Sequence, residues 1–383
     1  MSQRKQLVLI GAGHAHLYIA RRAAQFVRHG IRVVLIDPGR FWYSGLATGM
    51  LGGMYDPRSG QVEPKMLIEQ QGGLFVRDRV VMLARDRREL QLASGRTVPY
   101  DLVSLNIGSE VSWDLGPMPV ENVWTAKPIS GLWDLRQYLE RGFSTRASDV
   151  GNVLVIGGGP TGCELAANVD ALAHQHQAAA RITIVTRGTR LAEAARGRVS
   201  QVLMETLRRR GIEVVLDRAV TQLSNGLAVL DDGRRLLFDA AIVATGLRPS
   251  RDLAAWGFRV DDQGGLRVDA TLRSLDDDAV FGAGDCISLE RHFLPRLGVF
   301  AVRQSPILLH NLWAAASGGK LRTYRPQKRH LTILNLGRGQ GLATWGRLYW
   351  CGRSSLWLKG LIDRRFLAKY QIRPIADGPR GRV

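Results

Sequence analysis

Residues 6–38, QLVLIGAGHAHLYIARRAAQFVRHGIRVVLIDP, restrict the fold of this chain more than any other stretch. An apolar run ends at Ile10, Gly11 and Gly13 permit a tight turn, residues 17–27 have helical spacing, and a second apolar run ends at Asp37. Glycines let the backbone approach a pyrophosphate, and an acid at the tip of the second strand accepts hydrogen bonds from a ribose. The stretch therefore predicts a strand, helix and strand that together bind a dinucleotide.

One position departs from the GxGxxG pattern, because His16 replaces its third glycine. We expect either a slightly wider gap between helix and strand or an imidazole at the rim of the turn. His14 borders the same turn. We expect it to contact the cofactor by capping or packing, and not to act in catalysis.

A second unit of this kind begins at residue 152, NVLVIGGGPTGCELAANV. It contains all three glycines, Gly157, Gly159 and Gly162, and Thr161 lies at the start of the predicted helix. Its partner strand is followed by Thr186 and Arg187, where an acid would select the free 2′-hydroxyl of NADH. An arginine there can pair with a 2′-phosphate, which favours NADPH, or either nucleotide. The alternative is a solvated arginine on a loop.

Three further stretches carry candidate ligand-binding positions. Residues 74–109 and 211–250 share a hairpin pattern followed by a buried strand, with Gly108 and Gly246 just after it. The later segment AVFGAGDC combines a short strand with Gly284 and Asp285, whose carboxylate can bind a polyol hydroxyl. Residues 40–53, RFWYSGLATGMLGG, predict a glycine-rich loop packed against a flat ring system, or a buried loop without a ligand.

Composition limits the classes of partner and compartment. The net charge of +19 indicates phosphate-bearing ligands, an anionic membrane or nucleic acid, and the absence of any nucleic-acid-binding signature disfavours the last. The three cysteines are far apart, and no His, Cys or acidic cluster has metal-ligand spacing, so we expect neither a disulfide framework nor a metal. We find no signal peptide and no apolar run long enough to span a bilayer, which favours a cytoplasmic protein.

Three segments taken in order, GAGHAH with Asp37, GGGPTGCELA and FGAGDC, resemble the two-dinucleotide-fold flavoproteins over nearly the whole chain. Within them the chain is most similar to type II NADH:quinone dehydrogenases, particularly the branch fused to selenide, water dikinase. The segments that carry this closer likeness are YSGLATGMLGG, YDLVSLNIGS, GVFAVRQSP, YRPQKRHLTIL and WLKGLIDRRFLAKYQ.

The resemblance implies an α/β fold with two Rossmann-like domains. The FAD domain would be discontinuous, residues 1–125 and 263–325, with the NAD(P)H domain, residues 126–262, inserted and a C-terminal region over residues 326–383. FAD would be held by Gly11, Gly13, Asp37 and Asp285, and the nicotinamide nucleotide by the glycines of the second unit. The implied reaction passes a hydride from NADH or NADPH to FAD and then two electrons to a quinone.

Three side chains are candidates for catalysis. Glu164 lies where related enzymes place a carboxylate near the nicotinamide or the flavin, although a first-turn acid can also complement a helix dipole. Lys127 could reach the flavin or could be solvated in its connector. Gln304 matches the final glutamine of the family's AQxAxQ segment, but the earlier positions differ, so the electron acceptor stays open.

Two alternative functions remain. The first is a sulfide:quinone oxidoreductase, because Cys163 lies near the position of one reactive thiol in those enzymes. They need a second cysteine near the segment HLTILNLG, which has none, so this function is disfavoured. A packing role fits Cys163 better. A flavin-bearing regulatory or partner-binding protein with little turnover is the other. It is motivated by His16, the altered AQxAxQ segment and the missing acid at Thr186 and Arg187.

The tail predicts an amphipathic, aromatic and basic helix over residues 357–370. Such a helix can lie among the headgroups of an anionic membrane, on the inner face of the cell membrane, where a lipid quinone is reached. The alternative is a helix docked on its own core or on a second subunit of a homodimer. The stripe consists of Trp357, Leu358, Leu361, Ile362, Phe366 and Tyr370.

Overall fold

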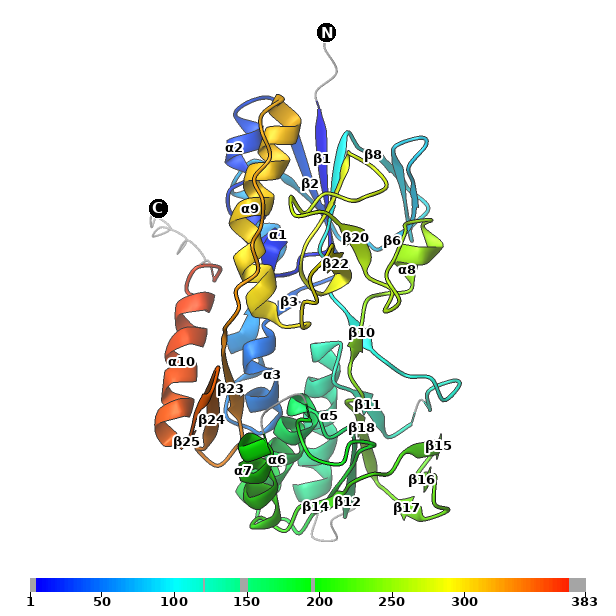
Figure 1. The fold of residues 1–383 in the computed structure, drawn as a ribbon, viewed down its shortest axis with the longest axis vertical. Helices are drawn as coiled ribbons and strands as arrows, with labels where there is room; N and C mark the ends of the chain where they lie inside the picture. The colour runs from blue at the N-terminus through cyan, green and yellow to red at the C-terminus, as the bar shows by residue number, and fades with distance from the viewer. Residues whose placement is uncertain (1–4, 120, 145–150, 194–196, 372–383) are drawn as a thin grey trace, which may run out of the picture.

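The computed structural model describes residues 5–119, 121–144, 151–193 and 197–371. Two five-stranded parallel sheets with helices packed against them are followed by a three-stranded antiparallel sheet and a C-terminal helix (Figure 1). The predicted α/β class with two Rossmann-like units is confirmed.

The first sheet has the order β21-β9-β1-β2-β5, and all its neighbours are parallel. Its central strand precedes the first glycine turn and is buried on both faces, as expected for a parallel sheet covered by helices. Helices α1, α2 and α9 pack around it (Figure 1). The bounds are β1 (Gln6–Ile10), α1 (His14–Ala20), α2 (Ala24–Val27), β2 (Arg32–Ile36), β5 (Leu74–Val76), β9 (Leu102–Leu105), β21 (Val280–Gly282) and α9 (Gly298–Ser317).

The second sheet has the equivalent order, β11-β18-β12-β13-β14, with the strand before the second glycine turn again in the centre. Each unit also carries an antiparallel meander, and both meanders shift register inside their first strand. The bounds are β11 (Val123–Thr125), α5 (Ile129–Ser144), β12 (Asn152–Ile156), α6 (Pro160–Gln175), β13 (Arg181–Val185), α7 (Gly197–Arg208), β14 (Glu213–Val215) and β18 (Ala240–Val243). The meanders are β6 (Val80–Ala84), β7 (Glu89–Leu92) and β8 (Thr97–Pro99), then β15 (Val220–Ser224), β16 (Leu227–Leu230) and β17 (Arg235–Leu237).

The chain crosses between the units along an antiparallel pair, β10 (Glu110–Val111) and β19 (Leu247–Arg248). Residues soon after this crossing return to the first core, where Leu253, Trp256 and Phe258 are buried. The first unit therefore resumes before residue 263, the start predicted for its second segment. The remaining elements there are α8 (Asp252–Ala255), β20 (Leu266–Val268), η2 (Gly284–Cys286) and β22 (Ile287–Leu289).

The expectation of a loop over residues 40–53 is wrong, because α3 (Ser44–Leu51) is a helix. It packs against α5 and α6, and its glycines allow aromatic rings to approach the helix closely. A Cβ at Gly45 would lie 2.4 Å from the Tyr43 ring, and one at Gly49 would lie 2.5 Å from the Tyr55 ring. Tertiary packing therefore outweighs the low helix propensity of glycine. The neighbouring elements are β3 (Phe41–Trp42), η1 (Pro57–Gly60), β4 (Gln61–Val62) and α4 (Pro64–Glu69).

The C-terminal part consists of β23 (Leu331–Asn335), β24 (Gly341–Trp345), β25 (Leu348–Gly352) and α10 (Arg353–Leu367), which lies against this sheet (Figure 1). Within α10, Lys359 and Asp363 are buried, whereas Trp357 and Leu361 of the predicted apolar stripe are exposed. No helix in the described ranges is long and apolar enough to cross a bilayer.

Candidate functional site

A cavity of about 610 Å³ lies where the two units meet. Its walls come from the turn after β1, the ends of β2 and β9, η2 and, from the second unit, the first turn of α6. Thr161 and Glu164 therefore face the same cavity as Gly11, Gly13 and Asp37. This is the carboxyl-end edge of the first sheet, where ligands bind in open α/β folds.

Asp37 holds the first glycine turn. Its Oδ2 accepts the N–H of Ala12 at 2.7 Å, and its Oδ1 accepts the N–H of Gly39 at 2.8 Å. Burial raises the pKa of Asp37, and these two hydrogen bonds oppose that rise. Each carboxylate oxygen keeps a further lone pair with which it can accept a ribose hydroxyl.

Asn106 is a site residue that the sequence did not reveal. Its Oδ1 accepts the N–H groups of Ala15 and His16, at 3.0 and 3.2 Å, in the first turn of α1. A Cβ at Gly13 would lie 2.4 Å from Asn106 Oδ1, and a Cβ at Gly284 would lie 2.6 Å from Asn106 Nδ2. Asn106 thus explains why both positions are glycine. In the sequence, the signal that could have identified Asn106 is an asparagine directly after the apolar strand 102–105.

His16 lies behind the glycine turn and is fully buried, so the expectation of an imidazole at the rim is wrong. Its Nδ1 lies 2.6 Å from the carbonyl oxygen of Gly11, and its Nε2 lies 2.9 Å from Ser104 Oγ. Because a carbonyl only accepts, Nδ1 carries the proton and Nε2 accepts from the serine hydroxyl. Burial lowers the pKa of His16 to about 4, so the ring is neutral at pH 7.

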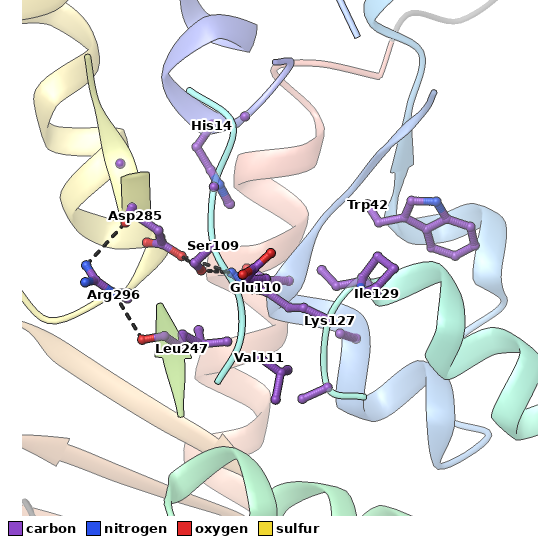
Figure 2. A pocket seen from close by; sticks show the side chains of 18 of the residues that line it. His14, Trp42, Ser109, Glu110, Val111, Lys127, Ile129, Leu247, Asp285 and Arg296 are labelled. Atoms are coloured by element: carbon purple, nitrogen blue, oxygen red, sulfur yellow. Dashed lines mark hydrogen bonds and ion pairs between the residues drawn. The ribbon is translucent and has the colours of Figure 1, made fainter. Parts of the chain in front are cut away.

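Lys127 and Asp285 meet on the cavity wall (Figure 2). Lys127 Nζ lies 2.9 Å from Asp285 Oδ2 and donates to Ser109 Oγ at 2.8 Å, while Ser109 Oγ donates to the same carboxylate at 2.8 Å. Burial would raise the pKa of Asp285, but Lys127 and Ser109 hold that pKa below its usual range. Arg296, also missed by sequence, donates to the carbonyl oxygens of Asp285 and Leu247 and so ties the two units together (Figure 2).

Glu164 is a half-buried carboxylate in the first turn of α6 that lines the first cavity. Its Oε1 accepts the N–H of Asn335 at 2.6 Å and the hydroxyl of Thr48 at 3.4 Å. Burial raises the pKa of Glu164 to about 7, and Lys359 is the largest opposing influence. A pKa near neutrality suits a carboxyl that donates or accepts a proton at pH 7, whereas a solvated first-turn acid would stay ionised.

The glycines of the second turn are required for different physical reasons. Gly157 has φ +122°, and a Cβ at Gly162 would lie 1.9 Å from the Gly157 carbonyl oxygen, so the helix packs on the turn without space for a side chain. Gly159 is the N-cap residue directly before α6, and a Cβ there would meet nothing within 4 Å. Its openness leaves the helix N-terminus accessible to an anion such as a pyrophosphate.

The tip of β13 lacks a carboxylate. Thr186 Oγ1 accepts the N–H of Gly188 at 3.2 Å, and the Arg187 side chain is exposed. Within the part of the chain that the structure describes, the Arg187 guanidinium has no hydrogen bond or ion pair. It is therefore available to a phosphate, as well as to solvent.

Gly108 and Gly246 both line the first cavity with positive φ, +76° and +110°. A Cβ at either would meet nothing within 4 Å of protein, so each presents bare backbone to the cavity. Together with the glycine turn and the paired Asp285, these positions fit a flat ring system with a pyrophosphate tail.

A second cavity of about 500 Å³ adjoins the first. The two share His14, Ser44, Leu297 and Gly298 as lining residues. The His14 ring packs at 5.0 Å from Phe41 and 5.5 Å from Phe366, and burial lowers its pKa to about 4. His14 therefore forms a neutral partition between the cavities, consistent with a packing role.

Gln304 lies apart from both cavities. It is fully buried in α9, and its Oε1 accepts the N–H of Gly284 at 2.7 Å. This contact positions the turn that carries Asp285, so Gln304 does not reach a molecule in either cavity.

The thiols do not form a reactive pair. Burial raises the pKa of Cys163 to about 12 and that of Cys286 to about 11, and neither lines the two cavities. Cys351 is exposed. In the described ranges no group of three or more His, Cys, Asp or Glu is placed to hold a metal ion.

A model of the pyridine nucleotide-disulphide oxidoreductase family matches residues 5–311. A type II NADH:quinone oxidoreductase of Haemophilus influenzae is 28% identical over 333 residues, covering 74% of each chain. Ferroptosis suppressor protein 1 of Taeniopygia guttata is 24% identical over 286 residues, covering 71% of each. The sulfide:quinone oxidoreductase structure from Aquifex aeolicus superposes with a TM-score of 0.80 over 96% of this chain and 91% of that one, at 14% identity, which shows a shared fold.

Proposed function

Because the chain belongs to the pyridine nucleotide-disulphide oxidoreductase family, we propose that it passes electrons from NADH or NADPH through FAD to a quinone at a membrane surface. FAD and a nicotinamide nucleotide are the cofactors. When bound, FAD supplies the two-electron chemistry that links hydride transfer to the acceptor. The observation that carries the proposal is the shared cavity, in which the first glycine turn and the first turn of α6 face one another.

The residues of the first unit would hold FAD. The turn at Gly11 and Gly13 with the N-terminus of α1 suits the pyrophosphate, Asp37 the ribose, and Asp285 the polyol chain. Lys127 keeps Asp285 ionised and places a cation on the cavity wall. The second turn and α6 would hold the nicotinamide nucleotide, with Arg187 against a 2′-phosphate.

The second cavity suits the acceptor. It adjoins the first behind His14, and much of its wall is apolar, which fits a quinone ring. Trp345 and Ile362 line this cavity and are also exposed, at 53% and 43%, so it opens towards the apolar outer face of the C-terminal part. A lipid quinone could thus enter from a bilayer without crossing water.

The outer face of the C-terminal part supports a membrane surface. Trp357 is 66% exposed and Leu348 72% exposed. Residues 318–371 contain twelve Lys and Arg but a single acid, Asp363, which is buried. Exposed aromatic and aliphatic side chains among cations favour an anionic bilayer. Binding to anionic vesicles with no self-association in solution would support this placement, whereas a dimer that ignores vesicles would assign the face to a second copy.

Adding NADPH or NADH to the purified yellow protein tests the reaction. Flavin absorbance is expected to bleach with at least one nucleotide and to return on addition of a soluble quinone analogue. Absence of bleaching with both nucleotides would contradict the enzyme proposal. Bleaching that the quinone analogue does not reverse would contradict only the acceptor.

A further inference from the structure

The second cavity is lined by cations that have no acid to balance them. Arg303 of α9 and Arg329, two residues before β23, both line it and are exposed. Neither guanidinium has a hydrogen bond or an ion pair with any described residue. Among the described residues of the wall, Asp363 is the only acid, and it is already paired with Lys359 Nζ at 2.8 Å. The charges of the two guanidiniums are therefore left unbalanced.

This excess of positive charge is specific to the second cavity. Residues 291–362, which supply α9, β23, β24 and β25, contain no Asp or Glu. The charges of the first cavity are nearly balanced, because four acids and three cations line it: Asp37, Glu110, Glu164 and Asp285, with Arg40, Lys127 and Arg296. Walls of one sign concentrate the electric field inside a cleft. The second cavity therefore favours an anionic ligand, beyond what the net charge of the whole chain implies.

The two guanidiniums belong to the open side of the cavity. A Cβ at Gly346 would lie 3.5 Å from Arg329 Cδ, so Arg329 lies beside the turn between β24 and β25. Trp345 in this turn lines the cavity and is 53% exposed, and Val302, next to Arg303, lines it and is 37% exposed. The remaining wall includes half-buried apolar side chains, namely Leu297, Leu331, Ile333 and Phe366.

An apolar wall with guanidiniums on its open side is complementary to a flat apolar molecule that carries an acid group. The planar fork of an arginine matches both oxygens of a carboxylate, and charge-assisted hydrogen bonds of this kind are about twice as strong as neutral ones. A neutral quinone would contact the apolar wall but would leave both guanidiniums to solvent. The charges thus narrow the class of acceptor further than the shape of the cavity does.

We propose that the acceptor in the second cavity is a quinone that carries a carboxylate, which Arg303 and Arg329 bind while the ring lies against the apolar wall. The inference rests on the proposed function, which supplies the electrons that the quinone receives. The two arginines determine which acceptor is bound and take no part in the electron transfer itself.

A quinone carboxylate and its uncharged methylamide test the proposal in the FAD-loaded protein. In the unaltered protein, kcat/KM for the carboxylate is expected to exceed that for the methylamide at least about tenfold. In the double variant Arg303→Gln with Arg329→Gln, the ratio of the two values should fall to within about twofold of one. Arg303→Lys with Arg329→Lys keeps both charges and should retain part of the preference.

The matched control removes two cations outside the cavity. Arg325 and Lys328 are exposed, belong to the same segment as Arg329 and do not line the second cavity. Arg325→Gln with Lys328→Gln lowers the net charge by the same amount as the glutamine variant of Arg303 and Arg329. It should therefore keep the preference for the carboxylate if that preference depends on contact and not on the overall charge.

A binding measurement without turnover isolates the anion site. Naphthalene-2-carboxylate cannot accept the electrons, and calorimetric titration of the oxidised protein should show about 10- to 100-fold weaker binding in Arg303→Gln with Arg329→Gln. In the unaltered protein this binding should weaken as salt rises from about 0.01 M to about 1 M, because the screening length falls from about 30 Å to about 3 Å. Naphthalene-2-carboxamide should bind without this salt dependence.

Equal kcat/KM for the two quinones in the unaltered protein would overturn the proposal. A preference that survives in Arg303→Gln with Arg329→Gln, or that falls equally in the control variant, would do the same. Loss of binding to anionic vesicles in the former variant, with the preference retained, would assign both cations to lipid headgroups. If neither nucleotide reduces the flavin of the unaltered protein, the proposed function fails, and the titration with naphthalene-2-carboxylate decides the anion site separately.

Discussion

The substitution Gly162→Ala separates intrinsic helix propensity from packing at the second glycine turn. Gly162 lies in the first turn of α6, where alanine is favoured over glycine by about 1 kcal/mol on propensity alone. In the structure, however, the new Cβ would lie 1.9 Å from the Gly157 carbonyl oxygen, whereas ordinary contacts begin at 3.4 Å. This carbonyl belongs to Gly157, whose N–H donates to the carbonyl oxygen of Val185 at the end of β13 at 2.8 Å. The oxygen can therefore move away from a new Cβ only if the whole turn moves relative to β13.

We expect this clash to outweigh propensity. Overpacking at a closely packed site costs about 1–3 kcal/mol, and each kcal/mol lowers the unfolding midpoint by about 2–4 °C in a unit of this size. Two controls share the chemistry of the substitution. Gly131→Ala in α5 meets nothing within 4 Å and should be neutral or stabilising. Gly159→Ala also meets nothing, so it should keep stability but weaken nucleotide binding, because its Cβ lies over the helix N-terminus.

Differential scanning fluorimetry of the three variants, with calorimetric titration of NADPH and NADH, measures both quantities. The reasoning is refuted if Gly162→Ala unfolds at the same temperature as Gly131→Ala. It is equally refuted if Gly159→Ala binds both nucleotides as tightly as the unaltered protein.

Three further outcomes are expected. Burial raises the pKa of Glu164 from 4.5 to about 7, so between these pH values the folded state holds a proton that the unfolded state releases. The free energy of unfolding should therefore fall as pH rises from about 4.5 to about 7. Glu164→Gln should flatten that fall in urea titrations at several pH values. Arg187→Ala should lower kcat/KM for NADPH about 10- to 100-fold and leave NADH unchanged, and an unaltered preference would remove the phosphate-pairing argument. Trp357→Ser with Leu361→Ser should weaken sedimentation with anionic vesicles at least tenfold, whereas equal binding would place the membrane contact elsewhere.

The glycine turns could be predicted because their requirements are local. A pyrophosphate needs close backbone and free N–H groups within one turn, and Gly11, Gly13, Gly157 and Gly162 meet that need over a few residues. The order of the two units follows from the order of the motifs along the chain. The same logic predicted Asp37 at the tip of the second strand.

Partners from distant segments could not be predicted in this way. Asn106 contacts a turn 90 residues earlier in the chain, and Tyr43 meets Asp363 across 320 residues. The glycine-rich segment around Gly45 is helical only because aromatic rings and two other helices pack on it. Propensity, which describes a segment in isolation, contains no term for those contacts.

The sequence by itself determined two dinucleotide turns, their order and the α/β class, because each depends on groups close together in the chain. Tertiary structure alone decided that the turns share one cavity, that His16 is a buried neutral bridge, and which face of α10 is covered. Periodicity identifies an apolar stripe but does not say whether core or exterior receives it. Here the covered face of α10 carries Lys359 and Asp363 together with Leu356 and Leu367. Tyr43 and Gly45 supply the hydrogen bonds that this buried ion pair requires.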